Sequence, residues 1–97
     1  MSYYEAYSKP LELLRKKHNY SKTYVAHMIG ISPSSVSNHE NGRTMPELMT
    51  IMHYCKFYKI SLAYFYQLVE YYQGISDVTH TVVDIRNDVA LGMVMGI

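Results

Sequence analysis

Two sets of helix start and stop signals follow one another in this chain with only three residues between them. Ser21 is a candidate N-cap, and Gly30 is the residue type that most readily takes the left-handed conformation that ends a helix. Ser32 followed by Pro33 is a second helix start, and Asn41 marks its end. The sequence therefore predicts two short helices joined by a tight turn.

Helix signals continue on both sides of this pair, which predicts an all-α fold of five helices. Ser8 as an N-cap and Pro10 in the first turn predict a first helix over residues 9–18. A fourth helix is expected over residues 46–58, where Pro46 opens it, and a fifth over residues 62–72. After Gly74 the signals conflict. A strand over residues 78–85 and a helix over residues 84–95 are both consistent with the pattern.

Apolar residues at helical spacing predict the core of this fold. The fourth helix has an i, i+3, i+4, i+7 stripe, and one side of the fifth is apolar. Methionine often fills irregular gaps in a core, so four methionines are assigned that role. The side chains expected to be buried are Val25, Ile29, Val36, Leu48, Ile51, Cys55, Leu62, Phe65 and Val69, with Met28, Met45, Met49 and Met52 as core filler.

The net charge of +1 conceals an uneven distribution along the chain. Residues 9–59 contain eight basic and three acidic side chains, a net charge of +5, whereas residues 60–97 contain one base and four acids. A positive field over the first part of the chain implies an anionic partner there.

The composition and motifs of the sequence argue against several classes of protein. The single cysteine, Cys55, excludes an intramolecular disulfide, and the five histidines lack the paired spacing of a metal site. We see no catalytic triad, paired carboxylates or phosphate-binding glycine loop, so we expect neither an enzyme nor a cofactor. The longest uncharged apolar tract, residues 89–97, is too short to cross a bilayer, and the first residues do not form a secretory signal. We therefore expect a cytoplasmic protein without a membrane span.

Two short helices joined by a turn that begins with glycine describe a helix-turn-helix, whose second helix enters the DNA major groove. The residues that specify this motif are Leu14-Arg15, Ser21-Lys22, Ala26, Gly30-Ile31-Ser32, Ser35-Val36-Ser37, Glu40-Asn41-Gly42-Arg43 and Pro46. This pattern resembles the lambda-repressor-like helix-turn-helix family, the Cro and Xre group. The resemblance covers residues 10–66 and implies a five-helix domain that binds double-stranded operator DNA as a homodimer.

The resemblance also implies roles for individual side chains. Asn38 can form two hydrogen bonds with the edge of an adenine, and a serine hydroxyl can donate to or accept from several bases. Lys22 stands where the family very often has glutamine, so it keeps a phosphate contact but loses the acceptor. The residues expected to read bases are Pro33, Ser34, Ser37 and Asn38, and those expected to contact the DNA backbone are Ser21, Lys22, Ser35, Asn41, Arg43 and Thr44.

Two further positions are interpreted through the same resemblance. Arg15 and Glu40 match a pair that forms a structural ion pair between the first and third helices of the family. His39 stands where the family commonly has an aromatic or aliphatic core residue. We interpret it as a single core histidine rather than a pH switch.

The chain is expected to divide into a DNA-binding domain over residues 1–73 and a C-terminal extension over residues 74–97. The extension is apolar and acidic, and exposed tyrosines on the fifth helix suit a subunit interface. The residues assigned to a dimer interface are Tyr64, Tyr71, Tyr72, Val82, Ile85 and Val89.

Two functions agree with these features. The first is a dimeric, sequence-specific transcriptional repressor of bacterial, phage or plasmid origin. The alternative is an antitoxin-like interaction protein that represses its own operon and masks a protein partner, or binds an antirepressor, with its C-terminal segment. A short toxin-like neighbouring gene would favour the alternative.

Overall fold

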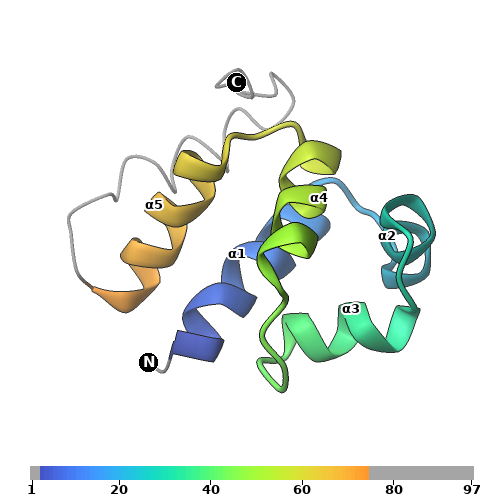
Figure 1. Ribbon diagram of the computed structural model, residues 1–97, viewed down its shortest axis with the longest axis horizontal. Helices are drawn as coiled ribbons and strands as arrows, with labels where there is room; N and C mark the ends of the chain where they lie inside the picture. Colours follow the sequence, from blue (N-terminus) through green and yellow to red (C-terminus); the bar gives the residue numbers. More distant parts are fainter. Residues whose placement is uncertain (1–2, 75–97) are drawn as a thin grey trace.

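The computed structural model describes residues 3–74, which form five α-helices and no strand within that range (Figure 1). This confirms the all-α, five-helix prediction. Residues 75–97, with the two alternatives for their structure and the interface residues Val82, Ile85 and Val89, lie outside the described residues. The helices are α1 (Tyr3–Lys17), α2 (Lys22–Ile29), α3 (Pro33–Glu40), α4 (Leu48–Tyr58) and α5 (Leu62–Gln73).

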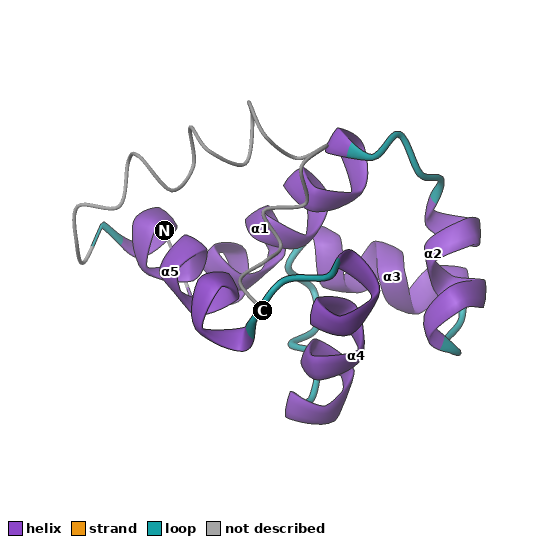
Figure 2. Cartoon of the chain, turned by 90° about the horizontal axis from the view of Figure 1, so that it is seen from above, coloured by secondary structure: helices purple, strands orange, loops and turns teal. Residues whose placement is uncertain are grey.

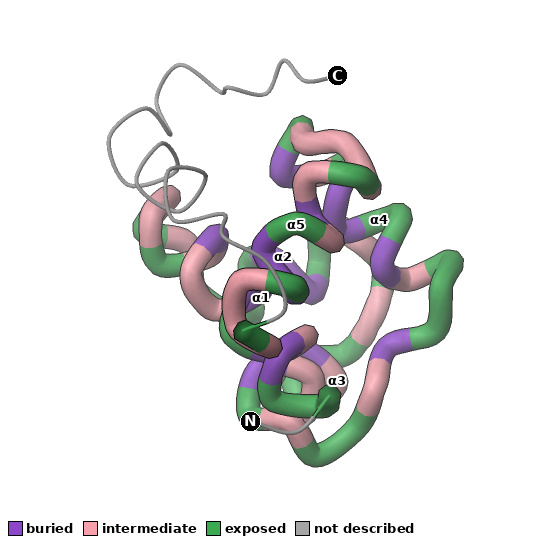
Figure 3. The backbone as a smooth tube through the Cα atoms, turned by 90° about the vertical axis from the view of Figure 1, so that its left-hand side faces the viewer, coloured by how far each residue is buried: buried purple, intermediate pink, exposed green. Residues whose placement is uncertain are grey.

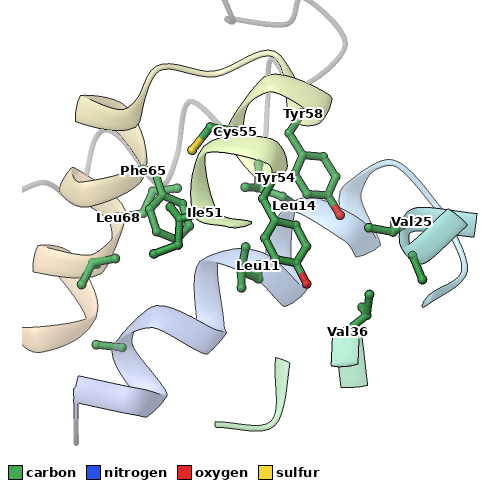
Figure 4. Close-up of a cluster of buried hydrophobic side chains, with 13 residues drawn as sticks. Leu11, Leu14, Val25, Val36, Ile51, Tyr54, Cys55, Tyr58, Phe65 and Leu68 are labelled. Atoms are coloured by element: carbon green, nitrogen blue, oxygen red, sulfur yellow. The ribbon is translucent and has the colours of Figure 1, made fainter. Parts of the chain in front are cut away.

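The helices α1 and α4 lie at the centre of the molecule, with α5 on one side and the pair α2 and α3 on the other (Figures 1 and 2). Figure 3 shows buried stretches alternating with half-buried and exposed ones along the helices. Each helix contributes to the core in Figure 4, with Leu11 from α1, Val25 from α2, Val36 from α3, Tyr54 from α4 and Phe65 from α5. One continuous core therefore fixes the orientation of α2 and α3 relative to the rest of the domain.

Serine caps determine where three of the helices begin. The hydroxyl oxygens of Ser21, Ser32 and Ser61 each accept a hydrogen bond from the backbone N–H three residues later, at 3.0–3.1 Å. These bonds satisfy donors that the first turn of a helix leaves free. The predicted starts of α2, α3 and α5 are therefore confirmed, whereas α4 begins two residues after Pro46.

The predicted start of the first helix was wrong. The helix α1 begins at Tyr3, so Ser8 and Pro10 lie inside it instead of opening it. The hydroxyl of Ser8 donates to the carbonyl oxygen of Glu5 at 2.9 Å, one turn back in the same helix, and so does not cap it.

Packing against α5 explains why α1 extends further than its local signals indicate. Ala6 is completely buried, and the ring of Tyr7 lies 6.0 Å from that of Phe65 and 5.7 Å from that of Tyr66, between centroids. Aromatic pairs at these separations stabilise beyond the area they bury. Tertiary contacts therefore outweigh the helix-starting preference of Pro10.

The predicted apolar face of α4 was right for Ile51 and Cys55, which are buried, and wrong for its other two residues. Leu48 and Met52 are exposed, whereas the tyrosines Tyr54 and Tyr58 are buried. Two stripes with the same spacing are apolar in this sequence, and the one with the larger aromatic side chains reaches the core. The buried face consists of Ile51, Tyr54, Cys55 and Tyr58.

Two other burial predictions were wrong. Met28, Met49 and Met52 are exposed and Met45 is half-buried, so the methionines do not fill the core. Tyr71 and Tyr72 are half-buried with ring centroids 5.1 Å apart, and Tyr64 is half-buried too, although all three were expected to be exposed. The rings pack against the core of their own chain, which leaves less aromatic surface on α5 for a second subunit.

Candidate nucleic-acid interface

The turn between α2 and α3 has the backbone conformation that its glycine predicts. Gly30 has φ +81°, and its N–H and that of Ile31 both donate to the carbonyl oxygen of Ala26, at 2.9 and 3.0 Å. A Cβ atom at Gly30 would meet nothing within 4 Å, so the conformation rather than space favours glycine. These two bonds end α2 and redirect the chain, so that α3 begins after only three residues.

Small and β-branched side chains bring α2 and α3 close together. Val25 and Val36 are completely buried, and Ala26 is almost so. Because α3 buries only Val36 and Glu40, most of its remaining surface faces outward. The packing therefore fixes the inner side of α3 against the core and leaves its polar side facing solvent.

The residues predicted to read bases lie on the presented side of α3. Pro33 and Ser34 are exposed at its start, and Ser37 and Asn38 are half-buried one turn on. The structure thus brings all four onto one short helix.

Hydroxyl groups bond to one another at the start of α3. The Ser32 Oγ lies 2.9 Å from that of Ser35 and 3.1 Å from that of Ser34. These contacts set the orientation of the first-turn hydroxyls, each of which can still accept or donate a further bond.

Lys22, the first residue of α2, connects the two helices of the motif. Its Nζ donates to the Oγ of Ser37 at 3.3 Å, and its side chain is exposed. A positive charge is therefore held beside the side of α3 that is predicted to read bases, next to the capped N-terminus of α2, where phosphate groups are favoured.

The turn after α3 contains the other residues that are predicted to contact the DNA backbone. The side-chain oxygen of Asn41 accepts a hydrogen bond from the N–H of Arg43 at 3.1 Å. The N–H groups of Arg43 and Thr44 also donate to the carbonyl oxygen of Asn38, at 3.0 and 3.4 Å. Asn41, Arg43 and Thr44 are all exposed. This turn leaves the Arg43 side chain in solvent while its backbone is fixed.

The predicted ion pair between α1 and α3 is confirmed. The Nε of Arg15 lies 2.7 Å from Oε2 and 3.0 Å from Oε1 of Glu40, and its Nη1 donates to the carbonyl oxygen of Tyr20 at 3.0 Å. The Arg15 side chain is 13% exposed and that of Glu40 4%. The hydrogen bond with Glu40 raises the pKa of Arg15. The C-terminal end of α3 is thereby fixed to α1 by a charged pair that water hardly reaches.

A second side-chain contact at this end of α3 was not predicted. The Nδ1 of His39 lies within 2.9 Å of the hydroxyl of Tyr54 on α4, and either atom donates depending on the imidazole tautomer. Burial lowers the pKa of His39, which favours the neutral imidazole. His39 is half-buried and bonded, so the expected core histidine has a specific partner. No spacing in the sequence joins these residues, because the contact depends on how α4 crosses α3.

Two buried tyrosines on α4 should respond differently to loss of their hydroxyl groups. Tyr54→Phe is expected to lower the free energy of unfolding by about 1 kcal/mol, since it removes the bond to His39. Tyr58→Phe is expected to be neutral or stabilising, because that buried hydroxyl has no hydrogen-bond partner among the described residues. Urea denaturation of the two variants measures the difference. Equal losses would show that the bond between Tyr54 and His39 contributes nothing.

Other kinds of site are not found in the described part of the chain. Residues 3–74 hold no cluster of His, Cys, Asp or Glu side chains suited to a metal, and none of their helices could span a membrane. Cys55 is buried, which raises its thiol pKa to about 11 and keeps it protonated at neutral pH.

Comparison with known proteins identifies the family. The helix-turn-helix family model matches residues 11–65, more than half of the chain and including α2, the turn and α3. No curated protein and no solved structure matches the chain. The match agrees with the glycine turn, the outward polar side of α3 and the Arg15–Glu40 pair. The chain belongs to the lambda-repressor-like helix-turn-helix family of DNA-binding regulators, which is the Cro and C1 type.

Proposed function

We propose that this protein is a dimeric, sequence-specific repressor of bacterial, phage or plasmid origin that inserts α3 into the major groove of its operator. The observation that carries the proposal is the fixation of α3. Its inner side is held by Val36, by the Arg15–Glu40 pair and by the His39–Tyr54 bond. Its other side holds the exposed Pro33 and Ser34 and the half-buried Ser37 and Asn38. A rigid polar helix of this kind suits base recognition, because a loosely held reader loses discrimination between bases.

Dimer formation is part of the proposal because one helix-turn-helix reads only a few base pairs. Two copies related by a two-fold axis would place their α3 helices about 34 Å apart on one face of the duplex. A protein bound there covers promoter DNA and blocks transcription, which favours repression. The same proposal places the protein in the cytoplasm, the compartment that holds the operator.

Footprinting on the DNA that flanks the gene tests this function. The protein should protect one or more short symmetric sequences at a stated salt concentration, which matters because affinity for DNA falls steeply with salt. Uniform or absent protection at all concentrations would overturn the proposal of a specific repressor.

Asn38→Ala is expected to weaken operator binding by about 1–3 kcal/mol and to relax preference at one base-pair position. Binding to unrelated duplex should hardly change, because non-specific binding depends on phosphate contacts and not on contacts to base edges. Titration against a set of operators with single base-pair changes measures both effects. An unchanged preference at every position would remove Asn38 from the base-reading residues.

Lys22→Ala and Arg43→Ala are expected to weaken binding to all sequences alike. Each removes one phosphate contact, so each should lower the slope of log affinity against log salt by about one unit. The control is Lys9→Ala, an exposed lysine on α1, which should leave the slope unchanged. Loss of affinity with an unchanged slope would mean that Lys22 acts only through its bond to Ser37.

A further inference from the structure

A groove of about 370 Å³ lies between the C-terminal half of α2 and α4. Its lining consists of Met28, Ile29, His53, Lys56 and Phe57. The methionines on these helices are unusually exposed, at 50% for Met28 and 47% for Met52. Exposed methionine side chains adapt to an apolar partner, so this surface has the properties of a docking site.

The surface around this groove is basic as well as apolar. The helices α2 and α4 contain no acidic residue, whereas Lys56 and His53 stand at the groove itself. The groove is also separate from the predicted DNA contacts, since Met28 lies in the last turn of α2 and Lys22 in the first. A fitting occupant is therefore an apolar segment that carries negative charge.

The chain itself contains a segment with these properties. Residues 75–97 hold three acids, Asp77, Asp84 and Asp88, against one base, Arg86, and twelve of the 23 residues are aliphatic or methionine. The same segment follows directly on Gly74, where α5 ends. Its composition complements the groove in both polarity and charge.

The position of Gly74 indicates which copy of the groove the segment reaches. The helices α5 and α2 lie on opposite sides of the molecule in Figures 1 and 2, and the longest dimension is 33 Å. Crossing between these sides within one chain would use up to about ten extended residues, at ~3.3 Å each, and Asp77 is among them. The residues left at the groove, from Asp84 onward, hold two acids against Arg86, a net charge of −1 compared with −2 for the whole segment. A groove in the same chain would therefore meet less of the segment's negative charge than a groove in a second copy.

We infer that residues 75–97 of one copy bind the groove between α2 and α4 of a second copy, reciprocally, in a two-fold dimer. This inference rests on the proposed dimeric function and assigns the surface that receives the C-terminal segment. Because each copy both gives and receives a segment, the contact closes at two copies.

Photo-crosslinking of the full-length protein tests this contact. Met52 is replaced by p-benzoylphenylalanine, and protein of natural isotope content is mixed with protein labelled with ¹⁵N. Met49, 61% exposed, is a second probe position in case the first variant does not fold, and Lys9 on α1 is the control position. The inference predicts cross-links from the two probe positions on α4 to residues 75–97 in peptide pairs of mixed isotope content, and none of this kind from Lys9.

Charge reversal adds a second measurement to the same experiment. Lys56→Glu should lower the yield of the mixed cross-link several-fold, Lys56→Arg should keep it, and Lys16→Glu should leave it unchanged. Cross-links only within isotopically pure pairs, cross-links to other segments, or yields that ignore the charge at Lys56 would each overturn the inference. Sedimentation of the same protein separates this failure from failure of the proposed function, since a dimer without the cross-link contradicts only the assigned contact.

Discussion

Arg15→Ala is expected to lower the free energy of unfolding by about 3 kcal/mol. The substitution leaves the carboxylate of Glu40, whose side chain is 4% exposed, without its charged partner, and it also removes the bond to the carbonyl of Tyr20. Breaking a buried pair on one side is costly because the remaining charge stays desolvated. For a domain of this size the melting temperature should fall by roughly 10–20 °C, which a thermal melt followed by circular dichroism measures.

Lys16→Ala is the matched control for this prediction. Lys16 pairs with Glu12 one turn away on the surface of α1, and its side chain is 64% exposed, so its loss should cost less than about 0.5 kcal/mol. Arg15→Lys should fall between the two, because one ammonium cannot reproduce the guanidinium's bonds to both Glu40 and Tyr20. Equal melting temperatures for Arg15→Ala and Lys16→Ala would reduce Arg15 to a surface charge.

Removal of residues 75–97 is expected to weaken operator binding by about a hundredfold or more. If this segment joins two copies, the truncated chain binds each half-site alone and loses the gain of linked binding. The truncation ends after Gly74, because this residue adopts φ +72° and its N–H bonds the carbonyl oxygen of Tyr71 at the end of α5. Sedimentation velocity and an operator titration on the same sample measure the two effects.

The helical content of the truncated protein is the control, since residues 3–74 contain the whole described core. A truncated protein that remains a tight dimer would contradict this role for the segment. It would favour the antitoxin-like alternative, in which residues 74–97 bind a different protein.

Local signals in the sequence correctly predicted those helix boundaries that depend on contacts between residues close together in the chain. Serine caps and left-handed glycines act through backbone bonds within a few residues, so Ser21, Gly30, Ser32 and Gly74 were assigned correctly. The start of α1 was missed, since it depends on Tyr7 meeting α5, more than fifty residues away in the chain.

Helical spacing correctly predicted that Ile51 and Cys55 on α4 are buried, but not which of the two overlapping stripes that share them faces the core. The choice depends on the neighbouring helices, because Tyr54 reaches His39 and stacks parallel to Tyr58 at 6.5 Å. Periodicity contains no information on such neighbours. The exposed methionines on α4 follow from the same shift, since burying Tyr54 turns Met49 and Met52 outward.

One contact beside the candidate site was predicted from the sequence, the ion pair between α1 and α3. The family resemblance paired Arg15 with Glu40, as the structure shows, whereas its assignment of Asn38, Lys22 and Arg43 to DNA contacts stays a prediction. Contacts that depend on three-dimensional geometry, such as Lys22 Nζ to Ser37 Oγ, could not be inferred from spacing.

Selection from a random duplex library at one fixed salt concentration tests sequence-specific binding by α3 most directly. The full-length protein should enrich a two-fold symmetric sequence whose half-sites are centred about one helical turn, ~34 Å, apart. Asn38→Ala should enrich the same sequence with one position in each half-site relaxed. Recovery of all sequences in equal proportion by the unaltered protein, or an identical enriched sequence for Asn38→Ala, would contradict base reading by this helix.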